Sequence, residues 1–279
     1  MAECHLSGCL ILHALGVLAV ISIVCVYNSK TVLADYLLKS LQVQTVEYEL
    51  ILVDNTEERY KSASEALNFG ARNAMGKYLM FVHQDVDLRS NSWLYDAERM
   101  LDSVPNLGIA GVAGKKDRTG VMTNVRHGNP PVLPARLQIE EPKEVQTLDE
   151  CLVIIPRSVF NKLHFDEETC SGWHLFAVDY CLSVTQFGLG AYVIPMFIYH
   201  RSTGATTRSA TGLIRSLDPL PDGYYQTLGK LLRKHKSYGR IYTTCGDWDN
   251  SSPLALQRVK HTVKAVSYTH LTLPTILLV

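Results

Sequence analysis

The most constraining feature of this sequence is a short apolar segment that runs directly into two carboxylates. Residues 78–83 are mostly apolar, rich in β-forming side chains and preceded by Gly76, which predicts a buried strand. Asp85 and Asp87 follow, one residue apart. Because an unpaired charge is costly to bury, a divalent cation that carries a diphosphate is one partner that suits this pair. An ordinary solvated turn is the alternative.

The segments around this strand alternate between apolar and amphipathic patterns, which predicts a βαβαβ order. Such an order favours a mostly parallel sheet with right-handed crossovers, flanked by helices. Ligands of these sheets bind beyond the carboxyl ends of the strands, where Asn28, Asp54 and Asp85 would meet. We therefore expect an α/β fold with a polar site at one sheet edge. The preceding strands and helices are expected at residues 21–26, 31–43, 48–53 and 62–75.

The remainder of the chain continues the alternation of strands and helices. Residues 118–143 contain four prolines and two glycines and are expected to form a long loop, which inside a compact domain is usually functional or mobile. Further strands are expected at residues 108–113, 152–155 and 192–199, and further helices at residues 93–100, 173–184 and 223–236.

Composition and short motifs argue against several classes of protein. Lys plus Arg equals Asp plus Glu, at 27 each, so the chain has no electrostatic footprint for nucleic acid. It has neither a G-x-G-x-x-G after the first strand nor a P-loop pattern, which counts against dinucleotide-binding and P-loop proteins. The seven cysteines are odd in number and include no C-x-x-C. We therefore expect reduced thiols and a cytoplasmic protein.

Both ends of the chain are expected to lie outside the main domain. Residues 8–27 are long and apolar enough to span a bilayer, but they overlap the first expected strand and have no basic flank. We interpret residues 1–20 as an extension or a docked helix, with a membrane segment as the alternative. Residues 266–279 are interpreted as a non-native tail that resembles translated adapter sequence. Residues 21–215 are then the main domain, and residues 216–265 a C-terminal helical segment.

Several segments together resemble the family-two glycosyltransferases with the GT-A fold. They are ISIVCVYNS, ELILVDNT, ALNFGARNAMGKYLMFVHQDV, WHLFAVDYCL and HRSTG, between residues 21 and 204. The form of these motifs is most similar to the prokaryotic group linked to capsule and surface-polysaccharide synthesis. The resemblance implies a nucleotide-sugar donor, expected to be a UDP-sugar, with Mn²⁺ or Mg²⁺ as cofactor. It also implies inverting transfer to a glycan or lipid-linked acceptor, in the cytoplasm or at the inner face of the membrane.

The resemblance assigns donor and metal roles to individual positions. Asp54 would accept a hydrogen bond from the uracil ring, and Asn68 begins the N-x-G-x-x-x-A-x-G pattern before the metal strand. Asp85 and Asp87 would bind metal and diphosphate, and His200 would be a third ligand. A strand-end histidine with a purely structural role is the alternative for His200. The residues expected to cradle the nucleoside are Val26, Tyr27 and Asn28.

The resemblance also assigns residues to the acceptor side. Asp179 falls where the catalytic base is expected, and a carboxylate can take the proton of an attacking hydroxyl. Trp173 and His174 would contact the acceptor. Asp179 could instead be a helix N-terminal acid favoured by the macrodipole, and Trp173 could belong to the core. The basic residues 230–236 could form a solvated helix face or contact an anionic membrane surface.

Two departures from the family pattern leave other functions open. Leu67 stands where the family often has an arginine that reaches the diphosphate, and Val178 stands where a glutamate usually precedes the base. A non-catalytic binding protein with the same fold is therefore one alternative. A sugar-phosphate nucleotidyltransferase is less favoured, because its glycine- and arginine-rich loop is missing after Val26.

Overall fold

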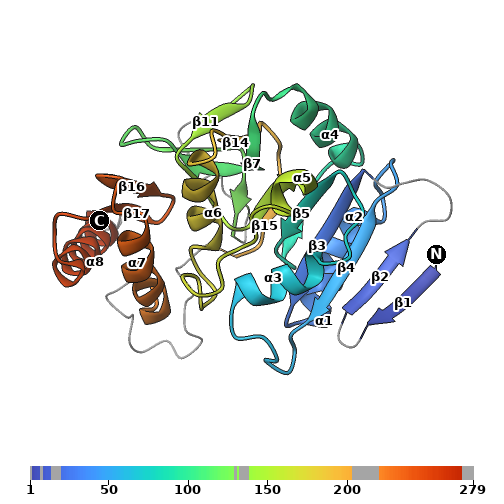
Figure 1. Cartoon of the computed structure of the whole chain (residues 1–279), viewed down its shortest axis with the longest axis horizontal. Helices are drawn as coiled ribbons and strands as arrows, with labels where there is room; N and C mark the ends of the chain where they lie inside the picture. Colours follow the sequence, from blue (N-terminus) through green and yellow to red (C-terminus); the bar gives the residue numbers. More distant parts are fainter. Residues whose placement is uncertain are drawn as a thin grey trace, which may run out of the picture.

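The computed structural model describes residues 2–6, 9–13, 20–128, 131, 138–202 and 220–271. Its central layer is a nine-stranded sheet (Figure 1). In spatial order its strands are β1 (Ala2–Leu6), β2 (Cys9–His13), β4 (Glu49–Asp54), β3 (Ile21–Tyr27), β5 (Tyr78–Val82), β13 (Leu152–Pro156), β7 (Leu107–Gly111), β14 (Gly190–Val193) and β11 (Lys143–Val145). The predicted βαβαβ unit is confirmed, because β3 lies between β4 and β5 and is parallel to both.

The sheet is mixed, and not mostly parallel as predicted, because β2, β11 and β13 each pair antiparallel with their neighbours. Among the described strands, β3 is parallel to β4 and β5, and β14 is parallel to β7, whereas the other five neighbouring pairs are antiparallel. Strand β13 enters between β5 and β7 in the opposite direction to both. The carboxyl ends of β3, β4 and β5 therefore share one edge, while Pro156, the last residue of β13, pairs with Tyr78 at the other.

Helices cover both faces of the sheet (Figure 1). On one face, Val24, Ile51 and Phe81 are buried against α3 and α6; on the other, Ile23 and Met80 are buried against the first helical segment and α4. The helices are α1 (Lys30–Leu33), the π-helical η1 (Ala34–Leu38), α2 (Lys39–Leu41), α3 (Ala63–Ala71), α4 (Trp93–Ser103), α5 (Arg157–Phe160), α6 (Phe176–Thr185), α7 (Asp222–Lys234) and α8 (Leu254–Leu271).

The local sequence explains where helix α3 begins and how close it lies to the sheet. Ser62 caps the helix, since its hydroxyl accepts a hydrogen bond from the Glu65 amide at 3.2 Å. A Cβ at Gly70 would lie 2.7 Å from Val24 Cγ1 and 2.8 Å from Val53 Cγ2. Only glycine therefore allows the helix to pack this closely on β3 and β4.

Smaller sheets extend the domain at its edges. The one that matters for the site has the order β10 (Arg126–His127), β15 (Tyr199–His200) and β6 (Val86–Asp87). A second has the order β12 (Thr147–Leu148), β8 (Ala113–Lys115) and β9 (Val121–Thr123), and a hairpin joins β16 (Arg240–Thr243) to β17 (Gly246–Asp249). Parts of residues 118–143 thus form short strands, where the sequence predicts only a loop.

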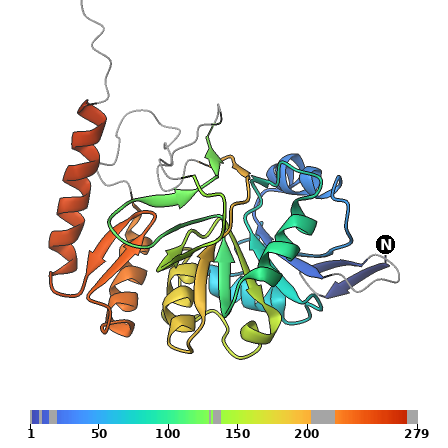
Figure 2. The same cartoon turned by 90° about the horizontal axis from the view of Figure 1, so that it is seen from above.

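The C-terminal elements pack on helix α6. Val178 and Leu182 of α6 share a buried cluster with Leu228 of α7 and Trp248 of β17. Helix α8 lies beside the β16–β17 hairpin (Figure 2), and a contact of 2.8 Å joins His261 Nε2 to the Cys245 carbonyl. Within the described part of the predicted C-terminal helical segment, residues 220–265 thus contain a β-hairpin between two helices.

The structure corrects two further predictions. Residues 2–6 and 9–13 form the antiparallel strands β1 and β2, and β2 pairs with β4, so these residues extend the sheet and do not form a docked helix. None of the described helices is long and apolar enough to cross a membrane.

The predicted strand at 192–199 is split into β14 and β15, because the chain leaves the large sheet after Val193 and joins the small one. Helix α8 continues past residue 266, and residues 272–279 lie outside the described part.

Candidate active site

The polar residues predicted at the sheet edge meet through the small sheet that contains β6. Strand β15 pairs antiparallel with β6, which places His200 opposite Val86. The Arg201 amide then donates a hydrogen bond to the Asp85 carbonyl at 3.1 Å. In this way a segment near residue 200 is fixed against the turn that follows β5.

A cluster of one carboxylate and two imidazoles results from this pairing. His200 Nε2 lies 3.2 Å from Asp85 Oδ1 and 3.4 Å from His83 Nδ1. The potential ligand atoms of His83, Asp85 and His200 all lie within 4.8 Å of one another. Asp85 and His200 are only 8% and 5% exposed, whereas the His83 side chain reaches the surface. The cluster is thus buried on one side and open on the other.

Asp85 is held in its ionised form. Burial of the carboxyl would raise its pKa, but hydrogen bonds from His200 and Ser202 outweigh burial and hold the pKa well below its usual range. The Ser202 amide donates to Asp85 Oδ2 at 3.2 Å, and the Ser202 hydroxyl donates to the same oxygen. A permanently charged carboxylate beside two imidazoles suits a divalent cation.

Asp87, the second carboxylate of the D-x-D motif, lies outside this cluster. Its Oδ1 accepts a hydrogen bond from the Arg89 amide at 2.8 Å, and its Oδ2 lies 3.3 Å from Arg89 Nη1. His83, which the sequence analysis did not single out, stands close to Asp85 instead. Its position two residues before Asp85 in the sequence was the feature that could have identified it as a site residue.

The predicted nucleoside-binding residues lie together at the carboxyl ends of β3 and β4. The Tyr27 hydroxyl donates to Asp54 Oδ2 at 2.8 Å, while Asp54 Oδ1 accepts from the Thr56 amide and hydroxyl at 2.9 and 2.7 Å. Burial opposes the ionised form of Asp54, yet these bonds, chiefly those from Thr56, lower its pKa. Val26, one residue before Tyr27, is partly buried against the core.

Gln84 connects the predicted nucleoside-binding residues to the cluster of His83, Asp85 and His200. Its Nε2 donates to Asn28 Oδ1 at 2.6 Å, and its Oε1 accepts from the Asn28 and Ser29 amides at 3.2 and 3.0 Å. The loop after β3 is therefore fixed to the turn that carries His83 and Asp85. Gln84 was not predicted as a site residue, although it stands between those two residues.

Asn68 is a buried residue of α3 whose side-chain amide donates two hydrogen bonds and accepts one. Its Nδ2 donates to the Phe165 carbonyl at 2.9 Å and to Glu167 Oε1 at 2.8 Å, and its Oδ1 accepts from the Phe165 amide at 3.1 Å. These contacts hold the loop before α6 against α3. The Asn68 side chain thus contacts this loop. A direct contact of Asn68 with the sugar donor stays a prediction.

Asp179, the predicted base, is 3% exposed and engaged by helix α7 and the residue after it. Its Oδ2 lies 2.7 Å from Lys234 Nζ, and its Oδ1 lies 2.8 Å from Nε2 of the fully buried His235. Lys234 also pairs with Asp166 at 2.8 Å. Burial opposes the charge of Lys234, but both carboxylates raise its pKa. The Asp179 carboxylate therefore links α6 to α7, which sequence periodicity alone did not reveal.

The two predicted acceptor residues lie in the loop that leads into α6. Trp173 is 43% exposed, so it is not a core residue. The His174 ring lies 5.9 Å from that of Tyr224, and burial lowers the pKa of His174. Burial therefore disfavours the charged form of the His174 imidazole in this loop.

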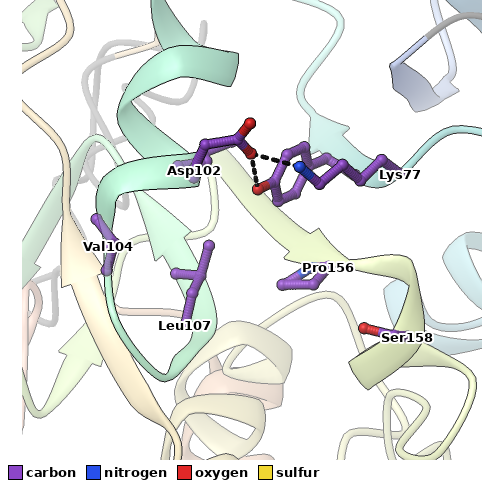
Figure 3. Close-up of a pocket in the computed structure, with 8 residues that line it drawn as sticks. Lys77, Asp102, Val104, Leu107, Pro156 and Ser158 are labelled. Atoms are coloured by element: carbon purple, nitrogen blue, oxygen red, sulfur yellow. Dashed lines mark hydrogen bonds and ion pairs between the residues drawn. The ribbon is translucent and has the colours of Figure 1, made fainter.

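A separate pocket of about 360 Å³ lies at the other end of β5 (Figure 3). Lys77, Tyr78 and Asp102 supply its polar wall, where Asp102 Oδ1 lies 2.6 Å from Lys77 Nζ and 2.5 Å from the Tyr78 hydroxyl. Tyr78 is the first residue of β5, whereas His83 and Asp85 follow its last residue, Val82. This pocket includes none of the predicted site residues.

Comparison with solved structures identifies the fold. GalNAc-T7 with UDP, GalNAc and Mn²⁺ has a TM-score of 0.53 at 15% identity, with 79% of this chain and 49% of that chain covered. The Pyrobaculum calidifontis mannosyltransferase PcManGT with GDP-Man and Mn²⁺ has a TM-score of 0.51 at 13% identity, covering 91% and 75%. S. aureus TarS has a TM-score of 0.51 at 15% identity, covering 77% and 39%. These likenesses confirm the GT-A fold, and the chain spans only about half of GalNAc-T7.

The sequence itself gives the family. No curated protein matches the chain. A family model described as "Glycosyltransferase like family" matches residues 21–199, which include His83, Asp85 and the whole βαβαβ unit and end one residue before His200. This match extends over more than half of the 279 residues. The chain therefore belongs to this glycosyltransferase-like family.

Proposed function

We propose that the protein is a metal-dependent, inverting glycosyltransferase that uses a nucleotide-diphosphate sugar, first of all a UDP-sugar. The observation that carries the proposal is the contact between Asp85 and His200 at the carboxyl edge of the sheet, joined by Gln84 to the loop after β3. Similar folds hold UDP with Mn²⁺ in GalNAc-T7 and GDP-Man with Mn²⁺ in the mannosyltransferase. The proposed acceptor is a hydroxyl of a glycan or of a lipid-linked sugar in surface-polysaccharide synthesis.

Different residues at the sheet edge would bind different parts of the nucleotide-sugar donor. Val26, Tyr27 and Asn28 would cradle the nucleoside, and Asp54, which Tyr27 and Thr56 hold in place, would bind the base. A divalent ion bound by Asp85 and His200 would neutralise the charge of the leaving nucleoside diphosphate. Asp85 is suited to this role because its pKa is held well below neutral pH by His200 and Ser202, against the effect of burial.

Inverting transfer also requires a base for the attacking hydroxyl. The resemblance proposes Asp179, with Trp173 and His174 beside the acceptor. The contacts of Asp179 with Lys234 and His235 instead favour a positioning role, because both carboxylate oxygens already have cationic or imidazole partners. A base must exchange one of these contacts for the acceptor hydroxyl during the reaction.

The engaged state of Asp179 supports a second candidate function. A protein that binds a nucleotide sugar without transferring it would need the donor site but no free base. Leu67, in place of the arginine that often reaches the diphosphate, points in the same direction. Donor binding without turnover would favour this candidate.

The basic residues of α7 bear on the proposed membrane contact. Lys230 Nζ donates to the Glu168 carbonyl at 2.9 Å and to the Ser171 hydroxyl at 2.8 Å, and Lys234 is paired with Asp166 and Asp179. These two lysines therefore hold the loop before α6. Contact of α7 with an anionic membrane is the weaker part of the proposal.

Calorimetric titration of UDP and GDP, with and without Mn²⁺, tests the donor site. We expect binding of one nucleotide that depends on Mn²⁺ and is lost in Asp85→Ala, while Asp102→Ala, in the separate pocket, binds normally. A screen of sugar nucleotides for release of the nucleoside diphosphate then tests transfer. Absence of binding by both nucleotides in a folded sample would contradict the proposal, and binding without release would favour the second candidate.

A further inference from the structure

We infer that His83, and not Asp87, is the third protein ligand of the proposed cation site, and that the site prefers transition-metal ions to Mg²⁺. This inference deepens the proposed function and rests on it for the presence of a metal. It differs from the D-x-D assignment, which places both aspartates on the metal.

Two of the three distances in the cluster match those between neighbouring ligands of one ion, and all three ligand atoms lie within 4.8 Å of one another. Two atoms that each lie about 2.1 Å from an ion are about 3.0 to 3.4 Å apart at octahedral or tetrahedral angles. His200 Nε2 lies 3.2 Å from Asp85 Oδ1 and 3.4 Å from His83 Nδ1. A single Nε2 proton cannot fully satisfy both of these neighbours, whereas one cation can accept a lone pair from all three atoms.

The turn after β5 explains why His83 reaches the cluster. The Val86 amide donates to the His83 carbonyl at 3.3 Å, which folds residues 83–86 into a tight turn. This turn brings the His83 ring to within 5.4 Å of the His200 ring, measured between centroids. His83 is exposed while Asp85 and His200 are buried, so solvent and phosphate oxygens can approach from the His83 side.

Asp87 has a different task in the same segment. Both its oxygens face Arg89, one through the backbone amide and one through the guanidinium. Arg89 has a φ of 64°, in the left-handed region that a non-glycine residue rarely adopts. The Asp87 carboxylate therefore stabilises a strained turn that carries an arginine at the edge of the site.

The ligand set decides the choice of ion. Mg²⁺ favours oxygen ligands, with one or two carboxylates and the substrate phosphates, and gains little from imidazole. Affinity for nitrogen ligands rises from Mn²⁺ through Co²⁺ and falls again only after Cu²⁺. Two imidazoles and one carboxylate should therefore bind Co²⁺ and Zn²⁺ more tightly than Mn²⁺, and all three more tightly than Mg²⁺.

Mn²⁺ binding to the full chain, followed by the loss of the free-ion EPR signal, tests the ligand set. We expect His83→Ala and Asp85→Ala to weaken binding at least about tenfold, since loss of even a supporting residue has that effect in metal sites. Asp87→Asn and the control His164→Ala, an exposed histidine outside the cluster, should bind like the wild type. His83→Gln is a second variant in case His83→Ala misfolds, and circular dichroism checks each fold.

Nitrogen couplings in the spin-echo modulation of bound Mn²⁺ give a readout that a merely structural role would not change. The wild type and Asp87→Asn should show two imidazole nitrogens, and His83→Gln one. Millimolar Mg²⁺ should fail to displace Mn²⁺, while Co²⁺ and Zn²⁺ should displace it. Loss of binding in Asp87→Asn with retention in both His83 variants would overturn the inference and leave the proposed function intact. No Mn²⁺ binding by the wild type, even with UDP, would overturn both.

Discussion

Removal of the Asp179 carboxylate separates its two possible roles, and the structure gives the size of the effect. Asp179 is 3% exposed and contacts His235, which is fully buried, and Lys234, whose side chain is one-third exposed. In Asp179→Ala, His235 Nε2 loses its carboxylate partner inside the core, whereas Lys234 keeps its contact with Asp166. The cost therefore comes from groups left buried without a partner.

Breaking a buried ion pair by removing one partner costs about 3–5 kcal/mol. Because Lys234 keeps Asp166 and is partly solvated, we expect Asp179→Ala to lie near the lower value, about 3 kcal/mol. For a domain of this size that corresponds to a fall in Tm of on the order of 10 °C. Lys234→Met should cost less, about 1 kcal/mol, because much of that pair is screened by solvent.

Urea denaturation followed by circular dichroism measures these free energies of unfolding, and UDP titration measures the donor site in the same variants. Asp179→Asn is the matched variant, since its amide keeps the shape and one acceptor oxygen. We expect stability to fall in the order wild type, Asp179→Asn, Asp179→Ala, with UDP affinity changed little. The positioning role would be refuted if Asp179→Ala were as stable as the wild type, bound UDP normally and transferred no sugar.

Three other perturbations follow from the described contacts. The pKa of Asp85 is held below its ordinary value by His200 and Ser202 against burial, so its ionised form stabilises the fold above about pH 4 and this contribution is lost as pH falls. Asp85→Asn should therefore make the free energy of unfolding less dependent on acid pH, and an unchanged urea profile between about pH 3 and 6 would contradict this. Gly70→Ala should destabilise the chain by about 1–3 kcal/mol, because its Cβ would lie 2.7 Å from Val24 Cγ1; a Tm within a degree of the wild type would argue against the packing. Asn68→Ala should speed proteolysis of the loop near Phe165 through loss of three hydrogen bonds, with UDP affinity retained, and lost affinity would instead support a donor contact.

Local patterns in the sequence determined the strands that build the domain. The apolar runs at residues 21–26, 48–53 and 78–83 became β3, β4 and β5, because a strand in a sheet that helices cover on both sides must be apolar on both faces. Helix α3 likewise follows from its apolar face and its Ser62 cap. The motifs together also fixed the GT-A fold, since they report the order of elements that the family shares.

Long-range pairing lay beyond the reach of these patterns. Hydrophobic periodicity is the same for parallel and antiparallel neighbours, so it could not show that β13 enters the sheet in the opposite direction or that β1 and β2 extend its edge. Nor could it show that the chain after Val193 moves from the large sheet to the small one, because this depends on the pairing of β15 with β6, which is distant in sequence.

The candidate site shows the same division. The sequence by itself determined that carboxylates and an imidazole would lie at one edge of the sheet, because local patterns show where each strand ends. Only the tertiary structure decided which of them meet. A tight turn folds His83 back towards Asp85, the β6–β15 pairing brings in His200 from more than a hundred residues away, and the turn at Arg89 engages Asp87. Likewise, the packing of α7 on α6 decided the partners of Asp179, because side-chain contacts depend on packing that spacing along the chain does not record.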